Sequence, residues 1–493
     1  MSSTSSRMSD SRDIWGRRAA PKVEIELDGQ KPGLVSSYTT GDQIHGTVTV
    51  SVEHDTRFDD IEIIFQGISH TTVERAACPG RTGSKQMFLK LRQPIQPDEY
   101  PTPRVLETNQ LYKFPFTFVV PDRLLPHVCT HETCNAQIHQ SHTMLPPTLG
   151  DPMISGNGKT LLNDMAPDMV RIAYVIRASV LARSTTDNGR LKTLANVGKK
   201  IRIIPYTEEA PPIPILDNAN YWLKKEKSVK RGFLRSKLGR MTASSTQPNP
   251  VQLLPPDCDQ RVSTVANVKL RFDPVSDEQP PMLGSLVSRL RVNTFYSATP
   301  WEDFPSQSGS VPFSHIGQGL FTETVPLSTM CVASAKWKKH STADVERRDS
   351  VDSTFSEASS QALSQGSTAS SSTFYTASLV IPINLPDTKA FVPTFHTCLI
   401  SRIYALDLSL SYHTPQANIL TPTISLRLPI QITTPPKYAN AVKTSLDVLV
   451  TEAELNEFFR PRSIAPLMHE AVVDVSPPPD YSETIVRPLP AFS

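Results

Sequence analysis

The sequence is poor in cysteine and in net charge, and it has no long apolar run. Its 6 cysteines are scattered over 493 residues, unlike the dense spacing of a disulfide-stapled domain. The net charge at pH 7 is +2, which argues against a nucleic-acid partner. No stretch approaches the roughly 20 apolar residues of a membrane span, and residues 1–18 lack the apolar core of a secretory signal. We therefore expect a soluble, cytoplasmic protein.

Catalytic motifs are also missing from the chain. We find no Gly-x-Ser-x-Gly nucleophile elbow, no His-Glu-x-x-His helix and no convincing pair of carboxylates. Aspartate and glutamate are spread along strand faces and loops, where they are usually solvated. We therefore expect a protein that is not an enzyme and that needs no cofactor.

The chain is rich in proline and in apolar residues that alternate with polar ones. It contains 44 prolines, and proline interrupts both helices and central strands. Apolar residues alternate with polar ones through many short runs, which indicates half-buried strands. Clear examples are Val170 to Val180, Leu406 to Tyr412 and Ile424 to Ile432. The pattern predicts an all-β protein built from sandwiches.

The predicted runs fall into two groups separated by segments of different composition. We expect a disordered tail at 1–20, a first β-sandwich at 21–205, a Pro-rich linker with a basic segment at 206–240, and a second β-sandwich at 241–434. A Ser-rich disordered insertion at about 340–372 interrupts the second sandwich. The tail at 435–493 carries one short helix candidate, in which Thr451 and Glu454 fit a capping box.

Two Pro-Pro-x-Tyr motifs follow the second sandwich. Paired prolines preset the polyproline II conformation, so little entropy is lost when they dock into an aromatic-lined groove of the WW type. A tyrosine three positions after the first proline returns to the same face of that three-residue helix. Two copies would raise avidity toward a partner with several such domains. The predicted binding residues are Pro435, Pro436 and Tyr438 in the first copy, and Pro478, Pro479 and Tyr481 in the second.

The order of these motifs resembles that of the α-arrestins, in the form of the fungal arrestin-related trafficking adaptors. The resemblance covers about residues 21–438, and it is carried by the order of the motifs across both sandwiches. The matching stretches are Tyr38-x-x-Gly41-Asp42-x-Ile44-x-Gly46-x-Val48, Ile61 to Gly67, Phe114 to Pro121, Leu145 to Asp151, Tyr174-x-Ile176-x-Ala178, Ile381-Pro382 with Leu385-Pro386, Ile400-Ser401-Arg402-x-Tyr404-x-Leu406 and Leu428-Pro429-Ile430-x-Ile432.

This resemblance implies two arrestin-type, immunoglobulin-like β-sandwich domains and an adaptor function. In such an adaptor the arrestin fold meets a membrane transporter or receptor, and the Pro-Pro-x-Tyr motifs recruit a HECT-type ubiquitin ligase through its WW domains. Cargo ubiquitination and endocytosis would follow, with recruitment to the plasma membrane or endosomes. Two alternatives stay open: an arrestin-like signalling scaffold, for example in ambient-pH sensing, and a β-sandwich module that binds a small ligand.

A loop in the first sandwich is rich in cysteine and histidine. We expect a polar surface loop with incidental thiols and no metal. The alternative is a zinc site formed by Cys129, His131, Cys134 and His139, although this spacing matches no standard zinc finger.

Three further features bear on partners and regulation. The stretch from Trp222 to Arg240 is basic, with apolar residues at near-helical spacing, and either contacts an anionic membrane or is a solvated linker. Ser350 follows Arg347-Arg348-Asp349 as in a basophilic kinase site, and a phosphate there could dock on a phosphoprotein reader. Lys443 lies near the first Pro-Pro-x-Tyr motif and is a candidate ubiquitin acceptor.

Overall fold

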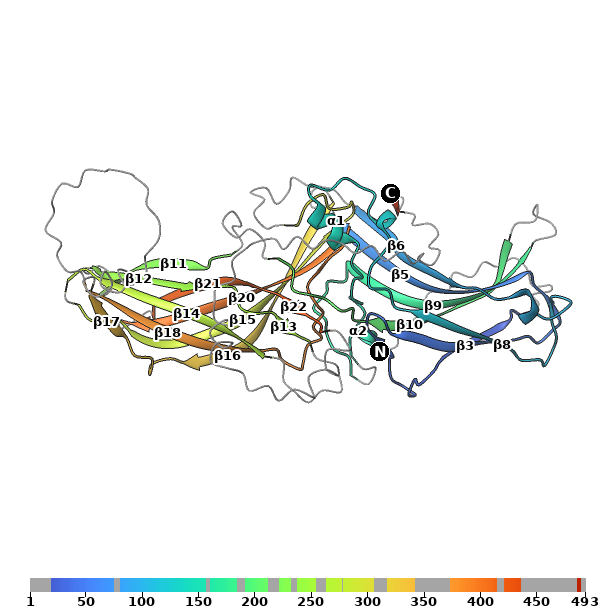
Figure 1. Ribbon diagram of the computed structural model, residues 1–493, viewed down its shortest axis with the longest axis horizontal. Coiled ribbons are helices and arrows are strands. Elements are labelled where there is room, and N and C mark those ends of the chain that lie inside the picture. Colours follow the sequence, from blue (N-terminus) through green and yellow to red (C-terminus); the bar gives the residue numbers. More distant parts are fainter. Residues whose placement is uncertain are drawn as a thin grey trace, which may run out of the picture.

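The computed structural model is an elongated molecule in which two β-sandwiches lie end to end (Figure 1). The described residues are 19–74, 80–156, 160–183, 191–211, 221–231, 237–253, 263–276, 278–305, 317–341, 373–414, 421–435 and 486–488. The predicted all-β fold with two sandwiches is confirmed.

The first sandwich packs a three-stranded sheet against a six-stranded sheet. The small sheet has the order β1-β3-β8, and the large sheet has the order β2-β10-β9-β5-β6-β23. The strands are β1 (Lys22–Leu27), β2 (Ser37–Tyr38), β3 (Gln43–Ser51), β5 (Asp60–Glu74), β6 (Arg81–Gln93), β8 (Tyr112–Val119), β9 (Val170–Arg183), β10 (Leu191–Ile203) and β23 (Val486–Pro488).

The core of the first sandwich follows from the alternation in its strands. In β9 the buried residues Ile172, Tyr174 and Ile176 alternate with half-buried or exposed ones, as a strand of period two requires. On the opposite sheet, Phe116 and Phe118 of β8 are buried, and Phe65 packs against Phe118 with ring centroids 5.9 Å apart. The predicted alternating run from Val170 to Val180 is therefore confirmed as a core strand.

The second sandwich also has two sheets. One has the order β11-β12-β14-β18-β17, and the other has the order β16-β15-β20-β19 with β21 paired to β20. The strands are β11 (Lys224–Lys230), β12 (Lys237–Ser245), β14 (Ser263–Pro274), β15 (Met282–Ser297), β16 (Gln318–Cys331), β17 (Lys338–Ser341), β18 (Thr373–Asn384), β19 (Phe395–His396), β20 (Ile400–His413) and β21 (Thr423–Ile430).

Short elements complete the fold. The two-stranded sheets are β4 (Thr56–Arg57) with β7 (Val105–Leu106), and β13 (Val251–Gln252) with β22 (Ile432–Thr433). The helices are η1 (Pro97–Glu99), η2 (Pro126–Val128), α1 (Ala136–His142) and α2 (Pro152–Ser155). Among the described residues, no helix is long and apolar enough to cross a membrane.

The prediction of a linker through residue 240 is wrong. β11 and β12 form an antiparallel hairpin, and β12 also pairs with β14 inside the second sandwich. Val229, Leu238 and Met241 are buried in the second core. The near-helical spacing of the apolar residues in this basic stretch was misleading. A β-hairpin at the edge of a sheet can carry exposed lysines between apolar residues with the same spacing. The physical reason is that strand pairing with β14 outweighs a weak local periodicity.

Other predicted segments fall partly or wholly outside the described residues. The Ser-rich insertion was placed at about 340–372, but β17 continues through Ser341, and residues 342–372 are outside the described part. The tail helix candidate at Thr451 and Glu454 is also outside it, as is the N-terminal tail up to residue 18.

The two sandwiches exchange apolar side chains across their interface. Tyr296, Phe395 and Ile400 of the second sandwich join the core of the first. In return, Met165, from the loop before β9, is buried in the core of the second. A buried hydrogen bond of 2.7 Å from the Thr71 hydroxyl to the Ser297 carbonyl also crosses the interface. The sandwiches are therefore interlocked rather than merely tethered.

A fully buried arginine lies at the centre of this interface. Arg402 of β20 is 0% exposed. Its guanidinium donates to the backbone carbonyls of Asp164, at 3.0 Å, and Met165, at 3.2 Å. The side chain of Asp164 accepts from the Gly150 backbone N–H at 2.6 Å and from the Ser155 hydroxyl at 3.1 Å. The loop that reaches into the second core is thus fixed from both sandwiches.

Gly150 and Asp151 each have a structural role next to this loop. The φ of Gly150 is +80°, in the left-handed region that favours glycine. A Cβ here would also lie against the Val170 carbonyl oxygen of β9. Asp151 then caps α2 by accepting from the Met153 N–H at 3.2 Å, and its carboxylate contacts the Lys200 ammonium at 2.6 Å. The Leu145 to Asp151 stretch is therefore a structural support for the interface.

We predict that Arg402→Met destabilises the protein by about 3 kcal/mol, because two buried carbonyls lose charged hydrogen-bond donors. Urea denaturation measures the free energy of unfolding. Arg289→Met is the matched control, since Arg289 is an exposed residue of β15, and its effect should stay within about 0.5 kcal/mol. Equal stability of the two variants would contradict the importance assigned to Arg402.

Candidate functional site

The connection from β8 to β9 builds a compact site at the junction of the two sandwiches. Pro126 begins η2, and Asn135 caps α1 by accepting from the Ile138 N–H at 2.9 Å. Ile138 is fully buried, which fixes the inner face of α1. Figure 1 shows α1 between the sandwiches. His142, in the last turn of α1, is 1% exposed and points into the junction.

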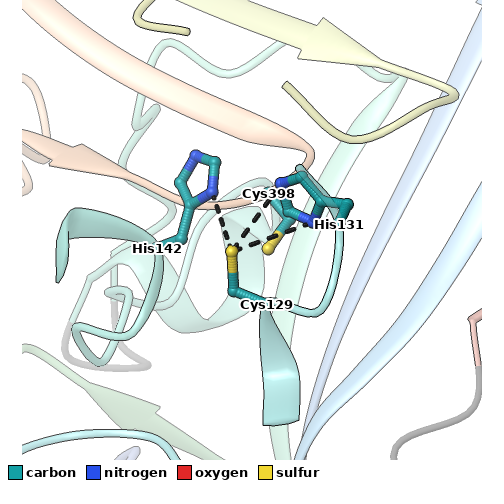
Figure 2. Close-up of side chains that lie close together, drawn as sticks. All are labelled: Cys129, His131, His142 and Cys398. Atoms are coloured by element: carbon teal, nitrogen blue, oxygen red, sulfur yellow. Dashed lines mark hydrogen bonds between the residues drawn. The ribbon is translucent and has the colours of Figure 1, made fainter. Parts of the chain in front are cut away.

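Four cysteine and histidine side chains converge there, as Figure 2 shows. Cys129, His131 and His142 come from the first sandwich, and Cys398 comes from the turn between β19 and β20 of the second. One sulfur or ring nitrogen from each lies within 4.8 Å of those of the others. We call these four residues the Cys2His2 cluster.

The sulfur of Cys129 lies at the centre of the contacts within the Cys2His2 cluster. It is 3.5 Å from Nδ1 of His142 and 3.8 Å from Nδ1 of His131 (Figure 2). The rings of His131 and His142 are 5.3 Å apart between centroids. Cys398 contacts the Val128 carbonyl with its sulfur at 3.8 Å. All four side chains are buried except His131, which is half-buried.

Burial sets the protonation of the cluster. Burial, together with the charges of the neighbouring histidines, lowers the pKa of His142 to about 3. Burial also lowers the pKa of His131. Both rings are therefore neutral near pH 7, and each offers a lone pair. The interaction between the neighbouring thiols lowers the pKa of Cys129 and raises that of Cys398, so Cys129 forms the thiolate more readily.

The prediction of a polar surface loop is wrong for these residues. Cys129 is 4% exposed and His142 is 1% exposed. Of the four residues in the zinc alternative, the structure brings Cys129 and His131 together. It places Cys134 and His139 outside the cluster, with Cys134 exposed.

Sequence reasoning missed two members of the cluster. His142 was visible in the same Cys/His-rich loop, one helical turn after His139, but residues at this spacing share a helix face, so the sequence could not tell which of the two enters the junction. Cys398 had no local signal, because no other cysteine lies near it in the sequence. Its partners become evident only once the two sandwiches are docked.

The other predicted site residues lie almost entirely outside the described part of the chain. Pro435 is the exception: it follows β22 and the Thr434–Thr207 bridge, and it is half-buried. Pro436, Tyr438, Pro478, Pro479 and Tyr481 are outside it, as are Ser350 and Lys443. Val486 to Pro488, just beyond the second motif, pair with Gln86 to Ser84 of β6.

We predict that Cys129 and Cys398 resist alkylation in the native protein. They are buried, whereas Cys134 and Cys331 are exposed, and reagents reach only accessible thiolates. Iodoacetamide labelling read by mass spectrometry should show reaction on the order of tenfold slower or more at the buried pair. All four should react alike in urea. Native labelling of Cys129 as fast as that of Cys134 would contradict the burial.

Comparisons with known proteins add a distant relative. The chain is 24% identical over 252 residues to Bypass of stop codon protein 5 of Saccharomyces cerevisiae, an arrestin-related protein. The aligned part is 41% of this chain and 49% of the yeast protein, so the chain spans about half the length of this relative. No protein-family model matches the chain. Together with the paired β-sandwiches, this similarity supports an arrestin-like protein.

Proposed function

We propose that this protein is an arrestin-like adaptor that recruits a WW-domain, HECT-type ubiquitin ligase to plasma-membrane transporters or receptors. It acts by binding and not by catalysis, and it promotes ubiquitination and endocytosis of its cargo. It works in the cytoplasm and is recruited to the plasma membrane or endosomes. The observation that carries the proposal is the pair of Pro-Pro-x-Tyr motifs attached to interlocked β-sandwiches.

The positions of the two motifs support a separation between ligase binding by the motifs and cargo binding by the sandwiches. The first begins at Pro435, directly after the Thr434–Thr207 bridge that closes the second sandwich. The second ends at Tyr481, five residues before Val486, where β23 pairs with the first sandwich. Ligase recruitment would thus be coupled to a rigid body that can engage cargo. Lys443, between the motifs, is the acceptor we propose on the adaptor itself, and phosphorylated Ser350 would let a phosphoprotein reader regulate it.

The β11–β12 hairpin gives the adaptor a basic surface for an anionic bilayer. Lys224, Lys225, Lys227 and Lys230 are all exposed on β11. Trp222, next to this strand, is 39% exposed, and the Lys225 ammonium lies 4.9 Å from its ring centroid. An amphipathic ring beside lysines suits the interface of an anionic membrane. Glu226 offsets part of this charge through contacts with Lys224 and Arg240.

We predict that Tyr438→Ala combined with Tyr481→Ala abolishes binding to a tandem WW protein, because both aromatic anchors are lost. Each single variant should weaken binding by tenfold or more through lost avidity, on the order of the gain that two linked sites provide. Calorimetry with the full-length chain measures the affinity.

The matched control changes the variable position of each motif. Lys437→Ala combined with Asp480→Ala keeps both prolines and both tyrosines, so binding should stay within about threefold. Unchanged binding in the double tyrosine variant would rule out the motifs as the ligase-binding sites.

We predict that Lys225→Glu combined with Lys230→Glu weakens binding to phosphatidylserine-rich vesicles by about tenfold or more, since each basic residue near such a surface contributes about 1 kcal/mol. Vesicle co-sedimentation measures the partition. Lys113→Glu combined with Lys192→Glu, at exposed positions of the first sandwich, is the control for net charge. An equal loss in both variants would show that net charge, and not the hairpin, governs binding.

A further inference from the structure

The Cys2His2 cluster has the composition of a metal site. It offers two sulfurs and two ring nitrogens, the ligand set of many structural zinc sites. Tetrahedral sites of two sulfurs and two nitrogens favour zinc over the hard cations magnesium and calcium, which take oxygen ligands.

The distances within the cluster fit a tetrahedron around zinc. Zinc–sulfur bonds of about 2.3 Å and zinc–nitrogen bonds of about 2.0–2.1 Å place a sulfur and a nitrogen about 3.6 Å apart in a regular tetrahedron. The Cys129 sulfur lies 3.5 Å from Nδ1 of His142 and 3.8 Å from Nδ1 of His131. All four ligand atoms lie within 4.8 Å of one another. The edges of the tetrahedron are about 3.3–3.8 Å, so the atoms need to approach one another by at most about 1.5 Å to close the site.

The contacts of both histidines within the cluster converge on one sulfur, that of Cys129. The thiol of Cys129 carries one hydrogen, yet its sulfur faces both His131 and His142. Only one of these contacts can use that hydrogen, and sulfur is a weak partner for the other ring. A cation at the centre would satisfy both rings and both sulfurs together.

The surroundings orient the ligands as a metal site requires. Nε2 of His131 lies 3.1 Å from the Trp301 carbonyl. The Cys129 sulfur lies 3.8 Å from Nδ1 and 3.7 Å from Nε2 of this ring. With Nε2 held by the Trp301 carbonyl, Nδ1 is the nitrogen left to ligate a metal, and backbone carbonyls fix ligating histidines in this way. Gln86 donates at 3.0 Å to the Val128 carbonyl, next to Cys129, and the Cys398 sulfur contacts the same carbonyl.

We propose that Cys129, His131, His142 and Cys398 bind one zinc ion that links the two β-sandwiches. Three ligands come from the first sandwich, and Cys398 comes from the second. The carbonyl that orients His131 belongs to Trp301, which is also part of the second sandwich. With four protein ligands, three of them fully buried, the site is closed and structural rather than catalytic. Metal binding therefore stabilises the docked arrangement of the sandwiches.

The test is the zinc content of the full chain, purified under reducing conditions from zinc-supplemented cells and measured by inductively coupled plasma mass spectrometry. We expect about one zinc per chain. Cys398→Ser and His142→Gln should each lower the content at least fivefold. The matched controls are Cys134→Ser, in the same loop, and His139→Gln, on the same helix, and both should keep the full content.

A second measurement needs no variant that could fail to fold. Cobalt should bind the zinc-stripped wild-type chain and give the intense visible absorption of a tetrahedral site with a thiolate-to-cobalt band. A chelator should lower the wild-type unfolding midpoint by roughly 5 °C or more, and it should not change the midpoint of Cys398→Ser.

Three results would overturn the proposal. The first is zinc-loaded wild-type protein that holds less than about a fifth of an equivalent, against the single ion that four ligands would bind. The second is full zinc content in Cys398→Ser, which would exclude a link between the sandwiches. The third is a Cys129–Cys398 disulfide in protein kept anaerobic, seen as a crosslinked peptide in mass spectrometry.

Discussion

The interface between the two sandwiches depends on a buried guanidinium that serves two backbone carbonyls. Arg402 is fully enclosed, and a buried charge is costly unless it is hydrogen-bonded on several sides. The loop carbonyls of Asp164 and Met165 accept from the two terminal nitrogens of Arg402, while its buried Nε has no hydrogen-bond partner. Gly150 holds the loop in turn through its N–H, which donates to the Asp164 carboxylate. The same loop and strand carry the apolar exchange, since Met165 and Ile400 flank this polar centre in the sequence.

The sequence allowed the strands to be predicted well, because each alternating run encodes its own buried face. The stripe Leu406 to Tyr412 became β20, and Ile424 to Ile430 became β21. The β11–β12 hairpin was missed because its exposed lysines, with Val229 as the single buried residue of β11, carry little alternation. Its pairing with β14 depends on tertiary contacts that no local window contains.

The Cys2His2 cluster shows the same limit at the level of a site. A Cys/His-rich loop could be seen in the sequence, but the pattern could not tell which members face inward. The capped helix α1 decides that His142 points to the junction. Cys398 comes from the other sandwich, so its part in the cluster follows from docking and not from spacing. The Pro-Pro-x-Tyr motifs are the opposite case, since polyproline recognition uses contiguous residues and can be read without a fold.

The exchange of core residues has a mechanical consequence. A hinge motion between the sandwiches would have to withdraw Met165 from one core and Ile400 from the other. Exposing each such side chain costs about 1.5–3 kcal/mol. The two sandwiches therefore behave as one rigid body, and their relative orientation is set during folding. A partner bound by one sandwich would keep a fixed orientation relative to a partner bound by the other.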